Sequence, residues 1–282
     1  MPKPNFLRVV LKREREQGAH LERALLGHYQ REFRAPEAEL RRLGRRDARR
    51  LGCFNLYARR WWLRALLRHL PRGVLAQGRL SASQPVFLLT LLDRNQVWRP
   101  ERDDGHSITA GPSLADIRQA YARHLQGLDA VGMIETALYV SAQRVLGSNR
   151  VMHFHLHALV WNVDEEALQA RCAAVNDEIR PVFGYATAAD ARLIEQGDLM
   201  QVAWYLAKAP RKQYQVHRKD NDRVKQFKRA INGVNAVRLY AELGRYTLDQ
   251  LTLASGGGRD VLRGMLTDLQ RWRNTSLRPR SD

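Results

Sequence analysis

Residues 151–161 read VMHFHLHALVW, an apolar run in which every second position from 153 to 157 is a histidine. In a β-strand alternate side chains share a face, so this pattern predicts a strand from which His153, His155 and His157 project together. Three buried imidazoles cost free energy unless they bind a ligand or find hydrogen-bond partners. This strand face is therefore a candidate site for a divalent metal ion, which neutral imidazole suits.

A single ion is held more easily by two adjacent histidines than by all three. At a rise of about 3.3 Å per residue, the outer two lie about 13 Å apart along the strand. A hard ion prefers oxygen as a further ligand, and Glu135, in the apolar run Gly132–Val140, is the candidate. The other interpretation of Glu135 is a hydrated carboxylate on a strand edge. A tight hairpin near Leu146–Asn149 would place Glu135 several residues along from the histidines, so an offset register is expected.

Segments on both sides of the histidine strand predict an α+β fold. Residues 85–92 (PVFLLTLL) form another short apolar run that is typical of a strand. Residues 113–127, 164–179 and 198–208 have the spacing of apolar residues that indicates helices. This order of elements predicts a central, mostly antiparallel sheet flanked by helices.

Basic residues are concentrated at the two ends of the chain. The formal charge is +18; lysine plus arginine outnumber aspartate plus glutamate by 20 to 7 in residues 1–80 and by 17 to 7 in residues 201–282, against 10 to 15 in the middle. This balance favours binding to nucleic acid, because a protein that offsets phosphate charge releases counterions. The alternative is that the arginines are only the solvated faces of helices.

These patterns divide the chain into a basic helical N-terminal region at 1–80, a core at 81–212 and a basic helical C-terminal region at 213–282. The N-terminal helices are expected to break near residues that disfavour or end helices, Gly18, Pro36 and Gly52. The N-terminal region also contains a long amphipathic run at residues 54–70. Three of its arginines are candidates for contacts with DNA phosphates, namely Arg59, Arg60 and Arg64.

The sequence carries no signal for a membrane or for secretion. No apolar run approaches the roughly 18 residues that cross a bilayer, and the N-terminus lacks the apolar segment of a secretory signal. Cys53 and Cys172 lie far apart and form no metal motif, so both are expected to be buried, reduced thiols. We therefore expect a cytoplasmic protein with no membrane partner.

The segment Gly197–Lys212 (GDLMQVAWYLAKAPRK) predicts a helix with one apolar stripe. Gln201, Tyr205 and Lys208 fall on another face. A tyrosine oxygen is a competent nucleophile once a metal polarises a phosphate, and a lysine one turn away can hold the phosphate or stabilise the phenolate. Most of the nine tyrosines are expected to be packing residues, so this interpretation depends on the histidine strand.

Together these segments resemble the HUH endonucleases, named for two histidines separated by a hydrophobic residue, and in particular the rolling-circle replication initiators of plasmids and phages. Residues 87–91 (FLLTL), 153–157 (HFHLH) and 205–208 (YLAK) resemble the three motifs of the family, in the same order. Glu135 lies in a strand ahead of the histidines, where many such initiators carry an acidic residue. The resemblance covers about residues 85–212 and implies an HUH-type nuclease core at 81–212.

The resemblance implies a reaction and the residues that carry it. The ligands of a magnesium or manganese ion would be His155, His157 and Glu135, with His153 as the alternate histidine. Tyr205 would attack a DNA phosphate to leave a 5′-phosphotyrosine and a free 3′-hydroxyl, and Lys208 would position the phosphate or the tyrosine. Besides the three arginines, the expected DNA contacts are Thr90, Gln201, Arg211 and Lys212.

The expected substrate is single-stranded or hairpin origin DNA, and the preferred role is that of a replication initiator. A host helicase and polymerase are expected partners, because the sequence has no obvious helicase P-loop. A rolling-circle transposase or a relaxase would share the chemistry. Two hypotheses from other classes are a non-catalytic nucleic-acid-binding regulator and a phosphodiesterase that activates water instead of tyrosine.

The sequence departs from the family pattern at two positions. Some initiators carry a glutamate four residues before the tyrosine, thought to activate water for termination, but Gln201 stands there and cannot act as a base. Families with two tyrosines on one helix commonly space them four apart, but Ala209 occupies that position. This favours a single nucleophile, with Tyr214 as a distant second candidate.

Overall fold

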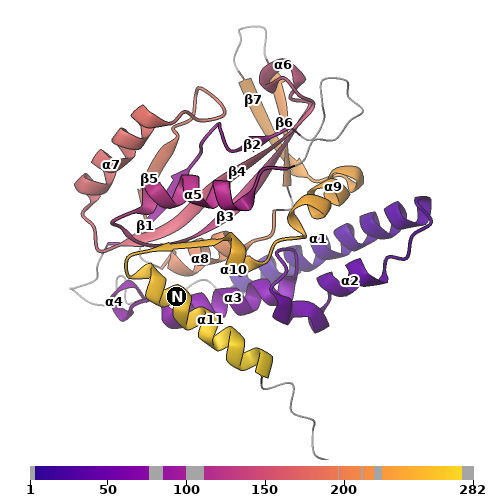
Figure 1. Ribbon diagram of the computed structural model, residues 1–282, viewed down its shortest axis with the longest axis horizontal. Helices are drawn as coiled ribbons and strands as arrows, with labels where there is room; N and C mark the ends of the chain where they lie inside the picture. Colours follow the sequence, from indigo (N-terminus) through magenta and orange to yellow (C-terminus); the bar gives the residue numbers. More distant parts are fainter. Residues whose placement is uncertain are drawn as a thin grey trace, which may run out of the picture.

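The computed structural model describes residues 4–75, 85–99, 111–195, 197–210, 212–218 and 224–274. Within these ranges, one eight-stranded sheet has the order β5-β1-β4-β3-β6-β7, with β2 paired to β4 and β8 paired to β3. All of its pairings are antiparallel except that of β3 with β6. The α+β class, with a mixed and mostly antiparallel sheet flanked by helices, is therefore confirmed (Figure 1).

The elements have the following bounds. The strands are β1 Phe87–Leu91, β2 Val97–Trp98, β3 Asp129–Val140, β4 Arg150–Trp161, β5 Ala189–Leu193, β6 Lys212–Arg218, β7 Val224–Ala230 and β8 Thr252–Ser255. The helices are α1 Pro4–Arg31, α2 Glu37–Leu43, the 3-10 helix η1 Arg45–Arg50, α3 Leu56–His69, α4 Arg72–Leu75, α5 Leu114–Leu125, α6 Gln143–Leu146, α7 Glu165–Glu178, α8 Leu199–Ala207, α9 Gly233–Leu243, α10 Leu248–Leu251 and α11 Gly258–Asn274.

The two longest strands, β3 and β4, form the centre of the sheet. Each has twelve residues, and nearly all of them are buried. Such continuous burial explains why their sequences are apolar on both faces, with the histidines as the exception. Helices cover both sides of the sheet: α5 and α7 lie on one side, and α8, α3 and α11 lie on the other (Figure 1).

The connection between β3 and β4 corrects one prediction. It is not a tight hairpin near Leu146–Asn149 but the whole segment 141–149, which contains α6 and turns at Ser141 and Gly147, both with positive φ. A tight turn at 146–149 would place Glu135 several residues along the sheet from the histidines. The longer connection brings them level. Glu135 therefore lies directly opposite His155 in the ladder, so the register is offset from that of a tight hairpin, as expected.

The C-terminal region is not wholly helical, which corrects a second prediction. It contributes β6, β7 and β8 to the sheet, and β6 extends beside β3 in parallel. Residues 212–218 (KQYQVHR) and 224–230 (VKQFKRA) do alternate, but they hold few apolar residues and β7 is mostly exposed. Polar strands at a sheet edge give only a weak hydrophobic pattern, so the basic composition hid them.

The first helix corrects a third prediction, because α1 continues through Gly18. A glycine inside a helix costs about 1 kcal/mol relative to alanine. Burying a leucine side chain is worth about 1.5–3 kcal/mol, and α1 buries Leu21 and Leu25 in the main core. Packing therefore outweighs the local preference. The other two breaks are confirmed: α2 begins after Pro36, and Gly52 lies between η1 and α3.

The main core joins all three regions of the chain. Its buried apolar residues come from the N-terminal helices (Leu25, Trp62), from the sheet (Phe154) and from α11 (Met265). The region boundaries drawn at 80 and 212 remain predictions. Among the helices described, none is both long enough and apolar enough to cross a membrane.

Candidate metal and tyrosine site

Strand register brings the site residues onto one face of the sheet. Thr90 of β1 pairs with His157 of β4, and Glu135 of β3 pairs with His155 of β4. Residues that pair across a ladder point to the same side, and alternate residues of one strand share a face. The four side chains therefore converge on the face that α8 covers.

Glu135, His155 and His157 form a group that can hold a metal ion. One ligand atom from each residue lies within 4.8 Å of the others, and all three residues are buried. Among the described residues, Oε1 of Glu135 is buried and has no hydrogen-bond partner. A carboxylate oxygen in that state costs free energy unless a cation compensates it. Two imidazole nitrogens and one carboxylate fit a divalent ion of the magnesium, manganese or zinc type.

Hydrogen bonds orient both histidine rings for such a role. Nδ1 of His155 lies 3.3 Å from the backbone oxygen of His153, which can only accept, so Nδ1 carries the proton and Nε2 keeps its lone pair. Nδ1 of His157 lies 3.0 Å from the hydroxyl of Thr90. A partner on the far nitrogen is the usual way in which a protein fixes a metal-binding imidazole.

Burial keeps these rings neutral. It lowers the pKa of His155 to about 4 and lowers the pKa of His157 well below its usual value. Neutral imidazole is the form that binds a metal ion. At neutral pH both rings are therefore ready to coordinate without first losing a proton.

The structure does not bring His153 into this group. Its Nε2 donates to the backbone oxygen of Asp93 at 3.1 Å, so this nitrogen holds the β1–β2 connection instead of facing Glu135. Burial lowers the pKa of His153 to about 3. Of the three histidines, the structure thus unites the preferred pair, His155 and His157, and leaves the alternate apart.

Tyr205 lies over the metal-ligand group. Helix α8 buries Leu206 and Ala207 against its neighbours, which leaves Tyr205 37% exposed at the edge of the site. Its hydroxyl lies 3.2 Å from Nε2 of His157. Burial, and then the nearby Glu135, raise the pKa of Tyr205 to about 12, so its hydroxyl is protonated at neutral pH.

Lys208 links the tyrosine to the carboxylate. It follows the last residue of α8, where the backbone is already extended. Its Nζ lies 3.2 Å from Oε2 of Glu135 and 2.9 Å from the centre of the Tyr205 ring. Burial raises the pKa of Glu135, and the positive charge of Lys208 opposes that rise. Lys208 thus already supplies part of the positive charge that Glu135 would also receive from a metal ion.

A cavity of about 160 Å³ opens beside these groups. Glu135, His155, Tyr205 and Lys208 line it together with residues of β6 and β7, among them Lys212, Tyr214 and Lys228. The predicted DNA contact Lys212 and the second tyrosine candidate therefore do reach the site. Lys228 was missed, because only the recognition of 224–230 as a strand would have placed it there.

Other predicted DNA contacts lie in different surroundings. Thr90 is half-buried against His157, so its first role is to orient that ring. Gln201 is exposed on α8, one turn before Tyr205. Arg211 lies outside the described residues. Arg60 and Arg64 line a separate pocket on α3.

Arg59 is not a surface residue, and its prediction as a DNA contact was wrong. It is 3% exposed. Its guanidinium donates to the backbone oxygens of Cys53, of Ala207 at 2.7 Å and of Lys208 at 2.5 Å. Helix α3 packs against α8 on this side, so the arginine satisfies carbonyls that the end of α8 leaves without helical partners.

The site thus combines a metal-ligand set, a tyrosine hydroxyl and the amino groups of Lys208, Lys212 and Lys228. A metal ion and a tyrosine hydroxyl are groups that can act on a phosphodiester. Comparisons of this chain with known protein families, with curated proteins and with solved structures found no match.

Proposed function

We propose that this protein is a metal-dependent enzyme that nicks and rejoins DNA, with Tyr205 as the nucleophile. The observation that supports it most is the position of the Tyr205 hydroxyl, 3.2 Å from Nε2 of a histidine in the metal-ligand group. The resemblance of the sequence motifs to HUH endonucleases points to the same chemistry.

Each residue has a role in this proposal. Glu135, His155 and His157 hold a magnesium or manganese ion, which would polarise the scissile phosphate when bound. Thr90 fixes the ring of His157 through Nδ1. Lys208, above the tyrosine ring, stabilises negative charge on the phenolate oxygen as it forms. Lys212 and Lys228 line the cavity where the strand would enter.

The reaction exchanges one phosphodiester for another. A bond forms between the Tyr205 oxygen and phosphorus while the bond from phosphorus to the 3′ oxygen breaks. The tyrosine loses one proton, and the 3′ oxygen gains one as it leaves as a hydroxyl. The product is a 5′-phosphotyrosine and a free 3′-hydroxyl, so no other reactant is consumed and the reverse step rejoins the strand.

The biological role that we propose is replication initiation at a single-stranded or hairpin origin. A free 3′-hydroxyl is the end that a host polymerase extends, and a host helicase would open the duplex. A transposase or a relaxase would use the same steps. The combination of a buried ion site with lysine-lined walls suits a single strand, because its phosphates are accessible from all sides.

The test is a covalent adduct between protein and DNA. Full-length protein is incubated with end-labelled single-stranded DNA, both random-sequence oligonucleotides and the candidate origin of its own replicon, with manganese or with EDTA. Tyr205→Phe is compared with Tyr214→Phe, a matched change in the same cavity. We expect a denaturation-resistant adduct in manganese for the wild type and for Tyr214→Phe, and none for Tyr205→Phe or in EDTA.

Other outcomes reject the proposal in distinct ways. Cleavage without an adduct that survives Tyr205→Phe would indicate a phosphodiesterase that activates water. An adduct lost in Tyr214→Phe and kept in Tyr205→Phe would move the nucleophile to β6. Binding with no cleavage of any DNA in manganese or magnesium would indicate a regulator without catalytic activity.

A further inference from the structure

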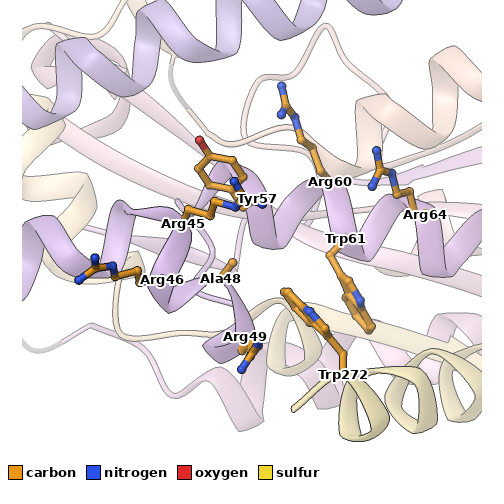
Figure 2. A pocket seen from close by; sticks show the side chains of 9 residues that line it. All are labelled: Arg45, Arg46, Ala48, Arg49, Tyr57, Arg60, Trp61, Arg64 and Trp272. Carbon is orange, nitrogen blue, oxygen red and sulfur yellow. The ribbon is translucent and has the colours of Figure 1, made fainter. Parts of the chain in front are cut away.

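Five arginines gather around a cavity that lies away from the tyrosine site. A pocket of about 770 Å³ opens between η1, α3 and α11 (Figure 2). Its wall carries three aromatic residues, no acidic side chain and five arginines: Arg45, Arg46, Arg49, Arg60 and Arg64. It shares no lining residue with the cavity at Tyr205.

The charge of this pocket is not compensated by acidic side chains in its wall. Figure 2 shows the guanidinium groups of Arg60 and Arg64 projecting from α3 in the same direction. Among the described residues, Nε and one terminal nitrogen of Arg60 are buried without a hydrogen-bond partner. Buried donors of a charged group are normally paired, so this guanidinium is suited to an anion. Arg60 therefore gives an observation independent of the overall basic charge.

The aromatic residues make the pocket suited to more than phosphate. Trp61 and Trp272 stack with ring centres 5.4 Å apart and an angle of 7° between the rings, and Arg49 lies over Trp272 at 5.6 Å. Tyr57 is 40% exposed, with Arg60 over its ring at 5.9 Å. Flat rings beside guanidinium groups are the combination on which unpaired bases stack while phosphates are held.

The pocket is held together by contacts between distant parts of the chain. Asp268 of α11 accepts from Arg68 at 2.7 Å and lies 3.0 Å from Nε2 of His69, both on α3. These contacts fix Trp272, one turn further along α11, beside Trp61. Because contacts within the chain hold these side chains in place, binding orders fewer groups, which reduces its entropy cost.

We propose that this pocket binds a single-stranded segment of nucleic acid, with its phosphates on Arg60 and Arg64 and an unpaired base on Tyr57. Its role would be to anchor DNA at a distance from the nick. That role rests on the proposed function, but binding itself needs neither the metal nor Tyr205. An acidic peptide would use the arginines without the rings, and an anionic membrane would prefer a convex surface to this pocket.

The experiment measures binding in EDTA, where no nicking takes place. Full-length protein is titrated into fluorescent oligothymidylate, and anisotropy is read at several salt concentrations. The variants are Arg60→Gln/Arg64→Gln and Tyr57→Ala, with Arg144→Gln on α6, an exposed arginine outside the pocket, as the matched control. Circular dichroism melts verify that each variant folds.

We expect the double variant to weaken binding at least tenfold. The slope of log affinity against log salt should fall by about 0.7 for each phosphate that the variant no longer holds. Tyr57→Ala should weaken binding roughly tenfold, because it removes the ring on which a base stacks, and Tyr57→Phe should restore it. An oligonucleotide of abasic residues should bind the wild type as weakly as oligothymidylate binds Tyr57→Ala.

Three results would overturn the proposal. The first is equal affinity of the double variant and Arg144→Gln. The second is abasic DNA that binds as tightly as oligothymidylate, which would reduce the pocket to a charged patch. The third is polyglutamate or anionic vesicles competing as well as DNA. If the wild-type protein forms no tyrosine adduct but still binds DNA at the pocket, only the proposed nicking reaction is rejected.

Discussion

The ion site and the arginine pocket are built in opposite ways. At the ion site, residues of three adjacent strands meet through a ladder register, and Glu135 and His155 are twenty positions apart in the sequence. At the pocket, Trp61 and Trp272 meet through the packing of α3 and α11, from opposite ends of the chain. The shared face of a strand can be anticipated from local spacing, as for the histidines of β4. A site made by helix packing requires the whole fold.

The two sites also suit ligands of opposite charge: the ion site suits a cation, and the arginine pocket suits an anion. The ion site is a buried, narrow space in which one carboxylate oxygen has no partner among the described residues. The pocket is wide and open, and its wall carries five arginines. Salt screens exposed charges strongly and buried ones little. We therefore expect DNA binding at the pocket to fall steeply with salt while metal binding changes little.

Removing one metal ligand should separate the sites completely. In His157→Ala the ion loses a nitrogen ligand, and we expect manganese binding measured by calorimetry to fall below detection. Binding of oligothymidylate in EDTA should be unchanged. His217→Ala, an exposed histidine on β6, is the matched control. Unaltered manganese affinity in His157→Ala would contradict this assignment of the ion site.

Two neighbouring arginines on α3 should behave in opposite ways. Arg59→Met leaves three backbone oxygens without their donor, and we expect it to lower the free energy of unfolding by about 2–4 kcal/mol. Arg60→Met removes a guanidinium with two unpartnered buried nitrogens, so stability should stay within about 0.5 kcal/mol or rise. Urea unfolding measures both. Equal losses would mean that Arg60 also has a structural role.

The hydrogen bond between Thr90 and Nδ1 of His157 should tune the ion site without destroying it. Thr90→Val keeps the shape of the side chain and removes the partner of Nδ1 of His157. Loss of such an outer partner typically costs 10- to 100-fold in metal affinity, and we expect roughly that reduction for manganese. Thr187→Val, in the loop before β5, is the control. An unchanged affinity would show that packing alone holds the ring.

The smallest effect should be the pH dependence of the contact that joins α11 to α3. Burial raises the pKa of Asp268, but hydrogen bonds from His69 and Arg68 outweigh it and hold the pKa below its usual 3.8. The stability that this carboxylate contributes is therefore present above about pH 4 and is lost as the pH falls below it. We expect less than about 1 kcal/mol, because solvent screens the pair. Asp268→Asn should flatten this part of the curve in acid unfolding.

The parts of the fold that could be predicted are those in which residues of one kind repeat at a regular local spacing. The alternation of histidines from 153 to 157 predicted both a strand and a shared face, and the helical spacing of Tyr205 and Lys208 predicted their proximity. Register could not be predicted, since it depended on the length of the segment 141–149. The same dependence explains why Glu135 could be chosen as a neighbour of the histidines only on the condition that the register was shifted from that of a tight hairpin.

The parts that could not be predicted share a different cause. The strands β6 and β7, at one end of the sheet, are so polar that burial leaves little pattern in them, and with them Lys228 was missed. Arg59 has the sequence context of a solvated arginine, and only the packing of α3 on α8 shows that it is buried. Helix propensity at Gly18 was outweighed by the burial of neighbouring leucines.

The contact of Arg59 with the end of α8 has a consequence for anyone who would shorten this protein. Its guanidinium donates to the carbonyls of Ala207 and Lys208, just after Tyr205. Arg59 itself lies in the N-terminal region, outside the segment that carries the motifs. A fragment that starts at residue 81 would lose this brace and expose the apolar side of α8. The candidate site is therefore not portable as the motif-bearing segment alone, and grafting it elsewhere would require carrying α3 along.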